Sequence, residues 1–322
     1  MKKEPENLIP AIEDILKAAK RIKPFINHTP VLTCKSLNRM VDASIYFKCE
    51  NFQKVGAFKF RGASNSVYSL SDEEARCGVA THSSGNHAQA LSLAAKNRGI
   101  GAYIVMPKDA PEIKIKAVQG YGGEITFCEP NLAAREEGLA KIVNKTGATF
   151  IHPYNDPRVI AGQGTVTLEL LEEVRKLDAV MAPVGGGGLL SGTALTLSSL
   201  SPETKIIGVE PKGADDAYRS LHQGKLIPSV NPNTIADGLL TSLGDLTFAI
   251  IKRYVHLIVT VSEDAIISSM RHIWERMKMV IEPSAAVPFA ALLEDKIDLK
   301  GKRIGLILSG GNVDLDKLPW LG

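Results

Sequence analysis

The segment GAFKFRGA, residues 56–63, places Lys59 between Phe58 and Phe60 at the predicted start of a helix. Burial among apolar neighbours would lower the pKa of this lysine and make its amine a nucleophile. A lysine of that kind can form a Schiff base with an aldehyde cofactor. A buried structural lysine also fits these eight residues, so the interpretation depends on later stretches of the chain.

Length and composition are those of a globular protein. At 322 residues, with 44% hydrophobic and 23% charged residues, the chain can bury a sizeable core arranged as two lobes. The net charge of +3 is too small to argue for a nucleic-acid partner. The uncharged run 179–202 contains four consecutive glycines, so we expect no membrane span or membrane partner. With no signal peptide evident and scattered cysteines, we expect a cytoplasmic location.

Strand and helix patterns alternate along the chain. Strands are predicted at 44–49, 78–81, 102–106, 124–128, 149–151, 179–184, 205–210, 256–261 and 303–308. Helices are predicted at 9–22, 59–68, 85–97, 113–119, 132–144, near 164–175, after the glycine run, at 263–277 and at 284–294. The alternation predicts an α/β fold with two doubly wound lobes of parallel sheet. We expect a large lobe from residues 1–75 and 155–322, and a small mobile lobe from 76–154.

A run of four glycines, Gly185 to Gly188, follows a predicted buried strand and precedes a helical pattern. Consecutive glycines can turn several backbone N–H groups toward one anion, and a helix N-terminus adds a favourable dipole. A flexible turn is the alternative interpretation. The placement after a buried strand favours a phosphate site, although no Walker motif closes the run.

A second strand-to-helix junction carries Ser83-Ser84-Gly85-Asn86-His87. Taken alone, it is best explained as an ordinary helix N-cap, because serine and asparagine are preferred capping residues. Beside a lysine Schiff base, its exposed N–H groups would instead suit a substrate carboxylate. Ser84 would then be an acid/base group and Asn86 a hydrogen-bond partner of the cofactor ring.

Three other positions fall at or near strand ends or on a helix surface. Glu210 ends a strand and Asp216 follows closely, which could provide oxygen ligands for Mg²⁺ or Ca²⁺, although a solvated acidic loop is favoured by spacing alone. Arg135 fits a surface position on a helix. Ser309 follows the last predicted strand, so its hydroxyl could point into the same cleft as the other motifs.

Together these stretches resemble fold-type II pyridoxal-phosphate enzymes, in the branch of serine racemases and serine/threonine dehydratases. The resemblance covers about residues 10 to 315 and implies a tryptophan-synthase-β-like fold with pyridoxal 5'-phosphate in the cleft between the lobes. The matching stretches are Lys59 with its neighbours, 83–87, 161–165, 185–188, 236–238, 274–278, 281–283 and 309–312.

The resemblance implies roles for individual residues. Those expected at the cofactor are Phe58, Lys59, Asn86, Gly185, Gly186, Gly187, Gly188, Gly238 and Ser309. Those expected at the substrate are Ser83, Ser84, Asn86, His87 and Arg135. The metal site of the family corresponds to Glu210, Asp216 and the carbonyl of Ala214, with Mg²⁺, Ca²⁺ or Mn²⁺ bound. Lys59 would form the Schiff base, the glycines would hold the phosphate, and Lys59 and Ser84 would be the catalytic pair.

The activity implied by this resemblance is racemisation of serine, with β-elimination to pyruvate and ammonia alongside it. Serine at position 84 favours a racemase, because many threonine dehydratases of the family have alanine there. The alternatives are a dehydratase of L-threonine or threo-3-hydroxyaspartate and, with little support, an aspartate racemase, since residues 154–156 lack a serine run. A ligand-binding protein without catalysis is a further alternative.

The family also implies a homodimer. Gln89, Arg276 and Lys278 are similar to residues near the nucleotide site of animal serine racemases, so a nucleotide effector is a further expectation. The main partner expected is a small hydroxy amino acid as substrate.

Overall fold

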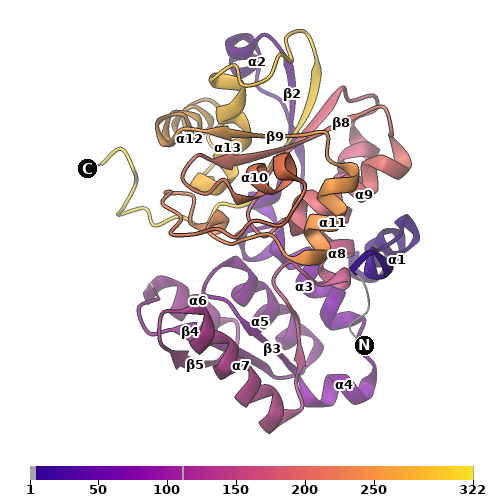
Figure 1. Cartoon of the computed structure of the whole chain (residues 1–322), viewed down its shortest axis with the longest axis vertical. Helices are drawn as coiled ribbons and strands as arrows, with labels where there is room; N and C mark the ends of the chain where they lie inside the picture. The colour runs from indigo at the N-terminus through magenta and orange to yellow at the C-terminus, as the bar shows by residue number, and fades with distance from the viewer. Residues whose placement is uncertain (1–4, 111, 322) are drawn as a thin grey trace.

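A computed structural model describes residues 5–110 and 112–321 of the chain. The protein has two lobes, each built around its own sheet (Figure 1). The strands are β1 (Val31–Leu32), β2 (Ser44–Cys49), β3 (Val79–His82), β4 (Ala102–Pro107), β5 (Glu124–Cys128), β6 (Thr149–Phe150), β7 (Ala179–Pro183), β8 (Lys205–Pro211), β9 (Leu257–Val261) and β10 (Arg303–Leu308).

Helices surround both sheets. The α-helices are α1 (Ile12–Ile22), α2 (Lys35–Val41), α3 (Lys59–Tyr68), α4 (Asp72–Cys77), α5 (Asn86–Arg98), α6 (Glu112–Gly120), α7 (Leu132–Thr146), α8 (Pro157–Glu173), α9 (Gly188–Leu200), α10 (Asp216–Gln223), α11 (Asp245–Tyr254), α12 (Glu263–Met277) and α13 (Pro283–Leu293). Short 3₁₀ helices are η1 (Pro5–Leu8), η2 (Glu50–Phe52), η3 (Lys54–Gly56) and η4 (Asp237–Leu239). No described helix combines the length and apolar character that a membrane span requires.

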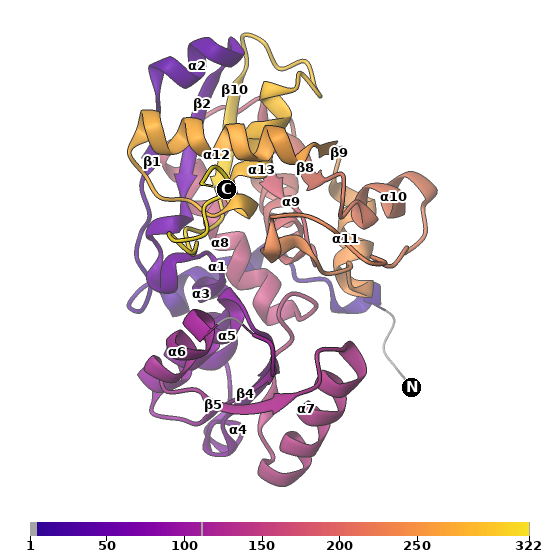
Figure 2. The same cartoon turned by 90° about the vertical axis from the view of Figure 1, so that its left-hand side faces the viewer.

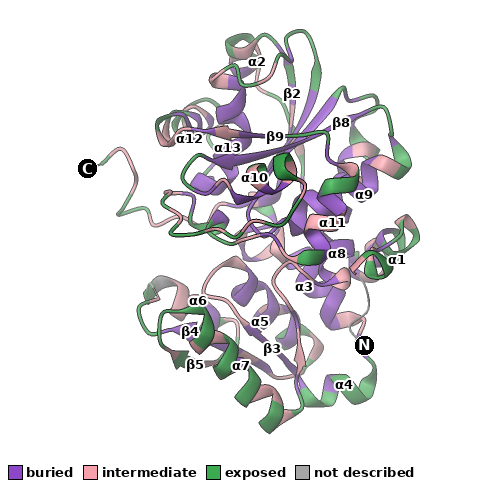
Figure 3. Cartoon of the chain, viewed as in Figure 1, coloured by how far each residue is buried: buried purple, intermediate pink, exposed green. Residues whose placement is uncertain are grey.

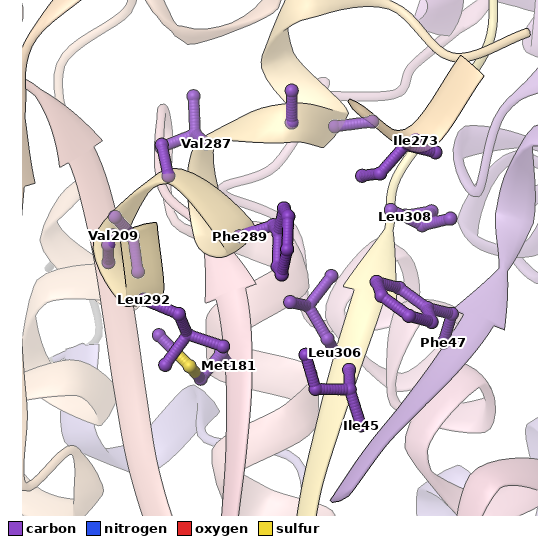
Figure 4. Close-up of a cluster of buried hydrophobic side chains, with 14 of the residues drawn as sticks. Ile45, Phe47, Met181, Val209, Ile273, Val287, Phe289, Leu292, Leu306 and Leu308 are labelled. Atoms are coloured by element: carbon purple, nitrogen blue, oxygen red, sulfur yellow. The ribbon is translucent and has the colours of Figure 1, made fainter. Parts of the chain in front are cut away.

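The sheet of the large lobe has the strand order β1-β2-β10-β7-β8-β9. All its neighbouring strands run parallel except β1, which pairs antiparallel with β2 at one edge. Helices α12 and α13 pack on one face, where Phe289 meets Phe47 edge-on at 6.1 Å between ring centroids (Figure 4). Helices α8, α9 and α11 cover the other face, and α1 packs on α8. Covering both faces lets these strands be almost wholly apolar.

The sheet of the small lobe has the order β5-β4-β3-β6, and all its strands are parallel. Helices α5 and α6 pack on one face, while α7 packs on the other. The view turned by 90° shows this lobe below the large one, with α7 on its outer side (Figure 2). Burial is greatest in the sheets and least on the outer faces of helices such as α4 and α7 (Figure 3).

Helix α3 packs on α8 of the large lobe and on α5 of the small lobe. Its Arg61 is fully buried and donates hydrogen bonds to Glu50 and Glu169, each at 2.7 Å. The buried ammonium group of Lys48 also bonds Glu169 at 2.7 Å. The two cations and the two carboxylates therefore neutralise one another inside the core. Removing any one of them would leave an unpaired buried charge and would destabilise the fold. This cluster fixes the helix that carries Lys59.

The predicted α/β class and most predicted elements agree with the structure, but the start of α8 does not. The sequence predicts this helix near 164–175, whereas it begins at Pro157, capped by the side chain of Asp156 at 2.8 Å from Arg158 N. The predicted start was wrong because it passed over a local start signal, Asp156 at the N-cap followed by Pro157. The glycines inside the helix allow close packing, since a Cβ on Gly162 would lie 2.6 Å from Gly62 Cα of α3.

Candidate active site

A pocket of about 440 Å³ lies between the lobes, at the carboxyl ends of β3, β7 and β10. Open α/β sheets bind ligands in this position. The sequence-predicted residues that line this one pocket are Phe58, Lys59, Ser83, Ser84, Asn86, His87, Arg135, Gly185, Gly186, Gly187, Gly188, Gly238 and Ser309. Stretches that are far apart in the chain thus meet as the sequence predicts, although their contacts with ligands remain predictions.

Lys59 is the first residue of α3, and its half-buried side chain lines the pocket. Its Nζ atom donates to the carbonyl oxygen of Pro153 at 2.9 Å and lies 5.2 Å from the centroid of the Phe58 ring. Burial lowers the pKa of Lys59 to about 8, and the negative charge of Glu282 partly opposes that effect. The amine therefore has the two properties, burial and a lowered pKa, that a Schiff-base lysine requires.

The glycine run leads directly into α9, as the sequence predicts. Gly186 faces the ring of Tyr154 so closely that a Cβ on this residue would lie 2.3 Å from the ring carbons. Its carbonyl oxygen also accepts a hydrogen bond from the Thr247 hydroxyl at 2.9 Å. The loop therefore has a fixed path beside the N-terminus of α9, with room for an anion but none for side chains. This arrangement fits the phosphate of pyridoxal phosphate.

Ser309 follows β10 and is joined to the lysine segment through the backbone. Phe58 N donates to Ser309 O at 3.0 Å, and Ala57 forms an isolated antiparallel bridge with Gly310. The side chain of Ser309 is buried beside the pocket. These backbone contacts fix the position of the Lys59 segment relative to Ser309. The two residues are expected at opposite parts of the cofactor. Together with the lysine and the glycine run, this serine fits a pyridoxal-phosphate site.

The junction between β3 and α5 carries the predicted substrate residues. Gly85 is the N-cap of α5, so no side chain occupies the capping position and the first N–H groups of the helix remain open. His87 is buried, and desolvation holds its pKa well below the usual value. Its Nε2 atom lies 3.3 Å from Ile151 O. The junction therefore has the neutral, donor-rich character that a substrate carboxylate requires, and the ordinary capping interpretation is wrong.

Arg135 reaches the pocket from α7 of the small lobe. The sequence pattern by itself would have placed this residue on a solvated surface. Its Nε atom is buried and has no hydrogen-bond partner among residues 5–110 and 112–321. An unsatisfied guanidinium N–H beside the substrate residues is suited to an anionic group of a ligand.

The acidic pair Glu210 and Asp216 lies outside the pocket, at the end of β8 and the start of α10. Glu210 accepts from Ala217 N at 3.1 Å and Tyr218 N at 2.7 Å, and Asp216 Oδ2 accepts from Leu243 N at 3.1 Å. Asp216 Oδ1 is buried and has no partner within the described part of the chain. Burial and the neighbouring Asp216 raise the pKa of Glu210 well above its usual value, while burial raises that of Asp216 to about 6.

A divalent cation would satisfy the free oxygen of Asp216 and offset the repulsion within this pair. The described residues contain no group of three or more His, Cys, Asp or Glu side chains suited to a metal. The predicted site has two such side chains and the carbonyl of Ala214, so the donor chemistry fits a hard cation while the site itself remains a prediction.

Sequence reasoning gave no role to Glu282, which forms part of the pocket wall. Its carboxylate accepts two hydrogen bonds from Asn86 Nδ2, both at 3.1 Å, and one from Asn312 N at 3.1 Å. Its neighbour Asp237 pairs with Lys114 across the two lobes. The sequence signals for Glu282 are its place in the family-matching stretch 281–283 and its position before a proline at the start of α13, and neither indicates what the carboxylate contacts.

Comparison with known proteins gives consistent matches over nearly the whole chain. Residues 22–310 match the family described as "Pyridoxal-phosphate dependent enzyme". A beta-hydroxyaspartate dehydratase of Paracoccus denitrificans is 55% identical, covering 97% of this chain and 99% of its own length. The L-threo-3-hydroxyaspartate ammonia-lyase of Saccharomyces cerevisiae is 50% identical, covering 98% of this chain and 97% of its own.

Solved structures agree with the sequence matches. The crystal structure of serine racemase from Dictyostelium discoideum has a TM-score of 0.92 and 50% identity, and it covers 96% of this chain and 100% of that one. The similarity confirms the fold class that the sequence predicts, with two α/β lobes around one cleft.

Proposed function

The chain belongs to the family of pyridoxal-phosphate dependent enzymes, and on that premise we propose that it is a serine racemase with serine ammonia-lyase activity, giving pyruvate and ammonia. The observation that carries this proposal is the grouping of Lys59, Ser84 and the glycine run in one enclosed pocket. A lysine nucleophile, a second hydroxyl group and a phosphate cradle are the parts that this chemistry needs.

The bound cofactor supplies an electron sink for the bond that breaks at the α-carbon of the substrate. Lys59 Nζ would remove the α-proton from one face, because a pKa lowered by burial to about 8 leaves a fraction of the amine neutral near pH 7 and most of it neutral above pH 8. The open N–H groups at the start of α5 bind the substrate carboxylate and orient the α-carbon. Ser309, which lines the pocket, would offer the ring nitrogen a neutral hydroxyl rather than a carboxylate.

Ser84 Oγ supplies or removes a proton on the opposite face of the α-carbon. Proton donation there inverts the centre, whereas return of the proton from Lys59 restores it. A serine hydroxyl is a weak acid and a weak base without tuning. Loss of the β-hydroxyl of L-serine therefore competes with reprotonation, and both products are expected from one enzyme.

A second candidate function is the dehydration of threo-3-hydroxyaspartate. The observation that favours it is the unpartnered Nε of Arg135, since a guanidinium binds a distal carboxylate better than a hydroxymethyl group. Two relatives with about half of their residues identical to this chain are named for hydroxyaspartate. L-threonine dehydration and aspartate racemisation have less support.

The test is one assay of purified protein with pyridoxal phosphate and Mg²⁺. L-serine, L-threonine and threo-3-hydroxyaspartate are supplied separately, and keto acid and D-amino acid are both measured. D-serine together with some pyruvate from L-serine supports the racemase. Keto acid without any D-product, fastest from hydroxyaspartate, would replace it with the dehydratase.

We further propose Mg²⁺, or Ca²⁺ or Mn²⁺, at Glu210, Asp216 and the carbonyl of Ala214, supported by the free buried oxygen of Asp216. A homodimer, a cytoplasmic location and a nucleotide effector near Gln89, Arg276 and Lys278 follow from the family resemblance. Residues 76–154 are proposed as the mobile lobe that closes on the substrate, with residues 1–75 and 155–322 as the larger lobe.

A further inference from the structure

Glu282 is a carboxylate in the pocket wall that the proposed mechanism does not use. It is the N-cap residue of α13, and only 4% of its surface is exposed. No described lysine or arginine forms an ion pair with it. Burying a carboxylate without a cationic partner costs free energy, and the hydrogen bonds to Glu282 offset part of that cost.

These hydrogen bonds fix the side chain of Asn86. The two carboxylate oxygens of Glu282 each lie 3.1 Å from Asn86 Nδ2, and Asn312 Nδ2 donates to Asn86 Oδ1 at 2.9 Å. Only the amino group of Asn86 can face the carboxylate, and only its oxygen can face the amino group of Asn312. The amide therefore has a single orientation that satisfies all three residues.

This orientation leaves one donor of Asn86 unused. The oxygens of one carboxylate subtend a narrow angle at Nδ2, so a single N–H serves both of them. The second N–H of the same amino group has no acceptor among residues 5–110 and 112–321, and Asn86 lines the pocket. It can therefore donate to an oxygen of a ligand while the first N–H holds Glu282.

Charged groups from three other elements face Glu282. They are Lys59 of α3, Asp237 of η4 and Lys114 of α6. Burial and Asp237 raise the pKa of Glu282 to about 7, while the donors Asn86 and Asn312 and the cation Lys114 oppose the rise. Glu282 and Lys59 line the same pocket, and the negative carboxylate raises the pKa of Lys59, so it favours positive charge on the lysine nitrogen.

We propose that Glu282 is a positioning residue that holds the Asn86 amide with one N–H directed at the phenolic oxygen of bound pyridoxal phosphate, and that its negative charge stabilises positive charge on the Lys59 nitrogen. The inference rests on the cofactor of the proposed function and on the role of Asn86 in it. It does not depend on which amino acid is the substrate.

The experiment compares Glu282→Gln, Glu282→Asp and the control Glu294→Gln. Glu294 lies at the other end of α13, where it bonds Ser262 away from the pocket. Cofactor-free protein is titrated with pyridoxal phosphate to obtain the dissociation constant, and the visible band of each loaded variant is followed from about pH 5 to about pH 10. Neither measurement requires turnover.

Glu282→Gln replaces one acceptor oxygen by an NH2 donor, so the side chain can no longer accept from both Asn86 Nδ2 and Asn312 N, and it removes the charge. We expect cofactor binding about tenfold weaker and the pH midpoint of the visible band about one unit lower. Glu282→Asp keeps the negative charge, but its shorter side chain does not reach Asn86 as well. It should therefore weaken cofactor binding, while the pH midpoint of the visible band stays that of the wild type. Glu294→Gln should change neither quantity.

Wild-type affinity and midpoint in Glu282→Gln would overturn the inference. If that variant does not fold, Glu282→Asp decides, because wild-type affinity in it would mean that the reach of the carboxylate to Asn86 is irrelevant. Failure of the proposed function has a different outcome: the wild type would bind pyridoxal phosphate and show the band, yet convert neither L-serine nor hydroxyaspartate.

Discussion

The Nζ atom of Lys59 donates a hydrogen bond of 2.9 Å to the carbonyl oxygen of Pro153. Lys59 begins the helix that packs on both lobes, and Pro153 belongs to the segment that leads from the small lobe back to α8. The nucleophile therefore contacts the connection between the lobes directly. A displacement of this connection would change both the position and the hydration of the amine.

The first prediction concerns the pH dependence of Lys59. Its pKa is about 8 instead of 10.5, because burial disfavours the charged amine. Reaction of cofactor-free protein with pyridoxal phosphate should accelerate as pH rises, with a midpoint near pH 8, and level off about one unit higher, where Lys59 is mostly neutral. Borohydride reduction followed by peptide mapping measures the rate at this residue. A rise that continues to about pH 10 would show an ordinary exposed lysine, and Lys59→Ala should abolish the labelled peptide.

The second prediction concerns Gly186→Ala. The added Cβ would lie 2.3 Å from the ring carbons of Tyr154, so the ring or the loop must move. We expect affinity for pyridoxal phosphate to fall by about tenfold or more, measured by absorbance titration, since misplaced loop N–H groups lose their charge-assisted hydrogen bonds. Gly120→Ala is the matched control, because nothing lies within 4 Å of its added Cβ. Tyr154→Ala in the Gly186→Ala protein should recover part of the affinity; no recovery would mean that the ring is not the obstacle.

The sequence predicts the lobes, the lysine helix and the glycine run because their signals are local. Strand and helix periods, and glycines after an apolar strand, can be recognised within a short window. The contact of Gly162 with Gly62, by contrast, joins residues 100 positions apart. The bond from Asn86 to Glu282 likewise joins residues 196 positions apart. Neither partner carries a local signal of the other.

The third prediction concerns Asp216 and divalent metal. Without metal, burial raises the pKa of Asp216 from 3.8 to about 6. A carboxylate whose pKa is higher in the folded than in the unfolded protein stabilises the fold most at a pH below its unfolded pKa. That contribution to the free energy of unfolding is lost as pH rises through the folded pKa, here between about pH 4 and pH 6. A shift of this size corresponds to about 3 kcal/mol. The melting temperature of metal-free protein should therefore fall across this range, and Mg²⁺ should restore it at neutral pH.

Asp216→Asn tests the same site. It removes one of the two repelling charges, so metal-free protein should melt higher at neutral pH than the wild type and should gain little from Mg²⁺. Asp178→Asn is a control that should keep the response to Mg²⁺, because Asp178 lies at the amino ends of the central strands β7 and β10, where it accepts from Arg303 N. Equal stabilisation of Asp216→Asn and the wild type by Mg²⁺ would place the cation elsewhere.

The fourth prediction is that Ser84→Ala affects racemisation of L-serine and its β-elimination to pyruvate differently. If Lys59 acts on one face and Ser84 on the other, removing the Ser84 hydroxyl leaves deprotonation by Lys59 and loss of the β-hydroxyl intact. It removes only the proton donor that inverts the centre. D-serine formation from L-serine should fall by at least about 100-fold, the usual range for one acid/base group, while pyruvate formation should fall by less than about tenfold.

Both products are measured in one reaction, so a folding defect or a loss of cofactor would lower them together. Ser198→Ala is the matched control, because that hydroxyl bonds only its own helix, α9, through Leu195 O. It should change neither product. An equal loss of both products in Ser84→Ala, with cofactor still bound, would contradict the assignment of two faces. Ser84 would then orient the substrate carboxylate beside the start of α5, and the protein would be a dehydratase whose second proton donor is absent.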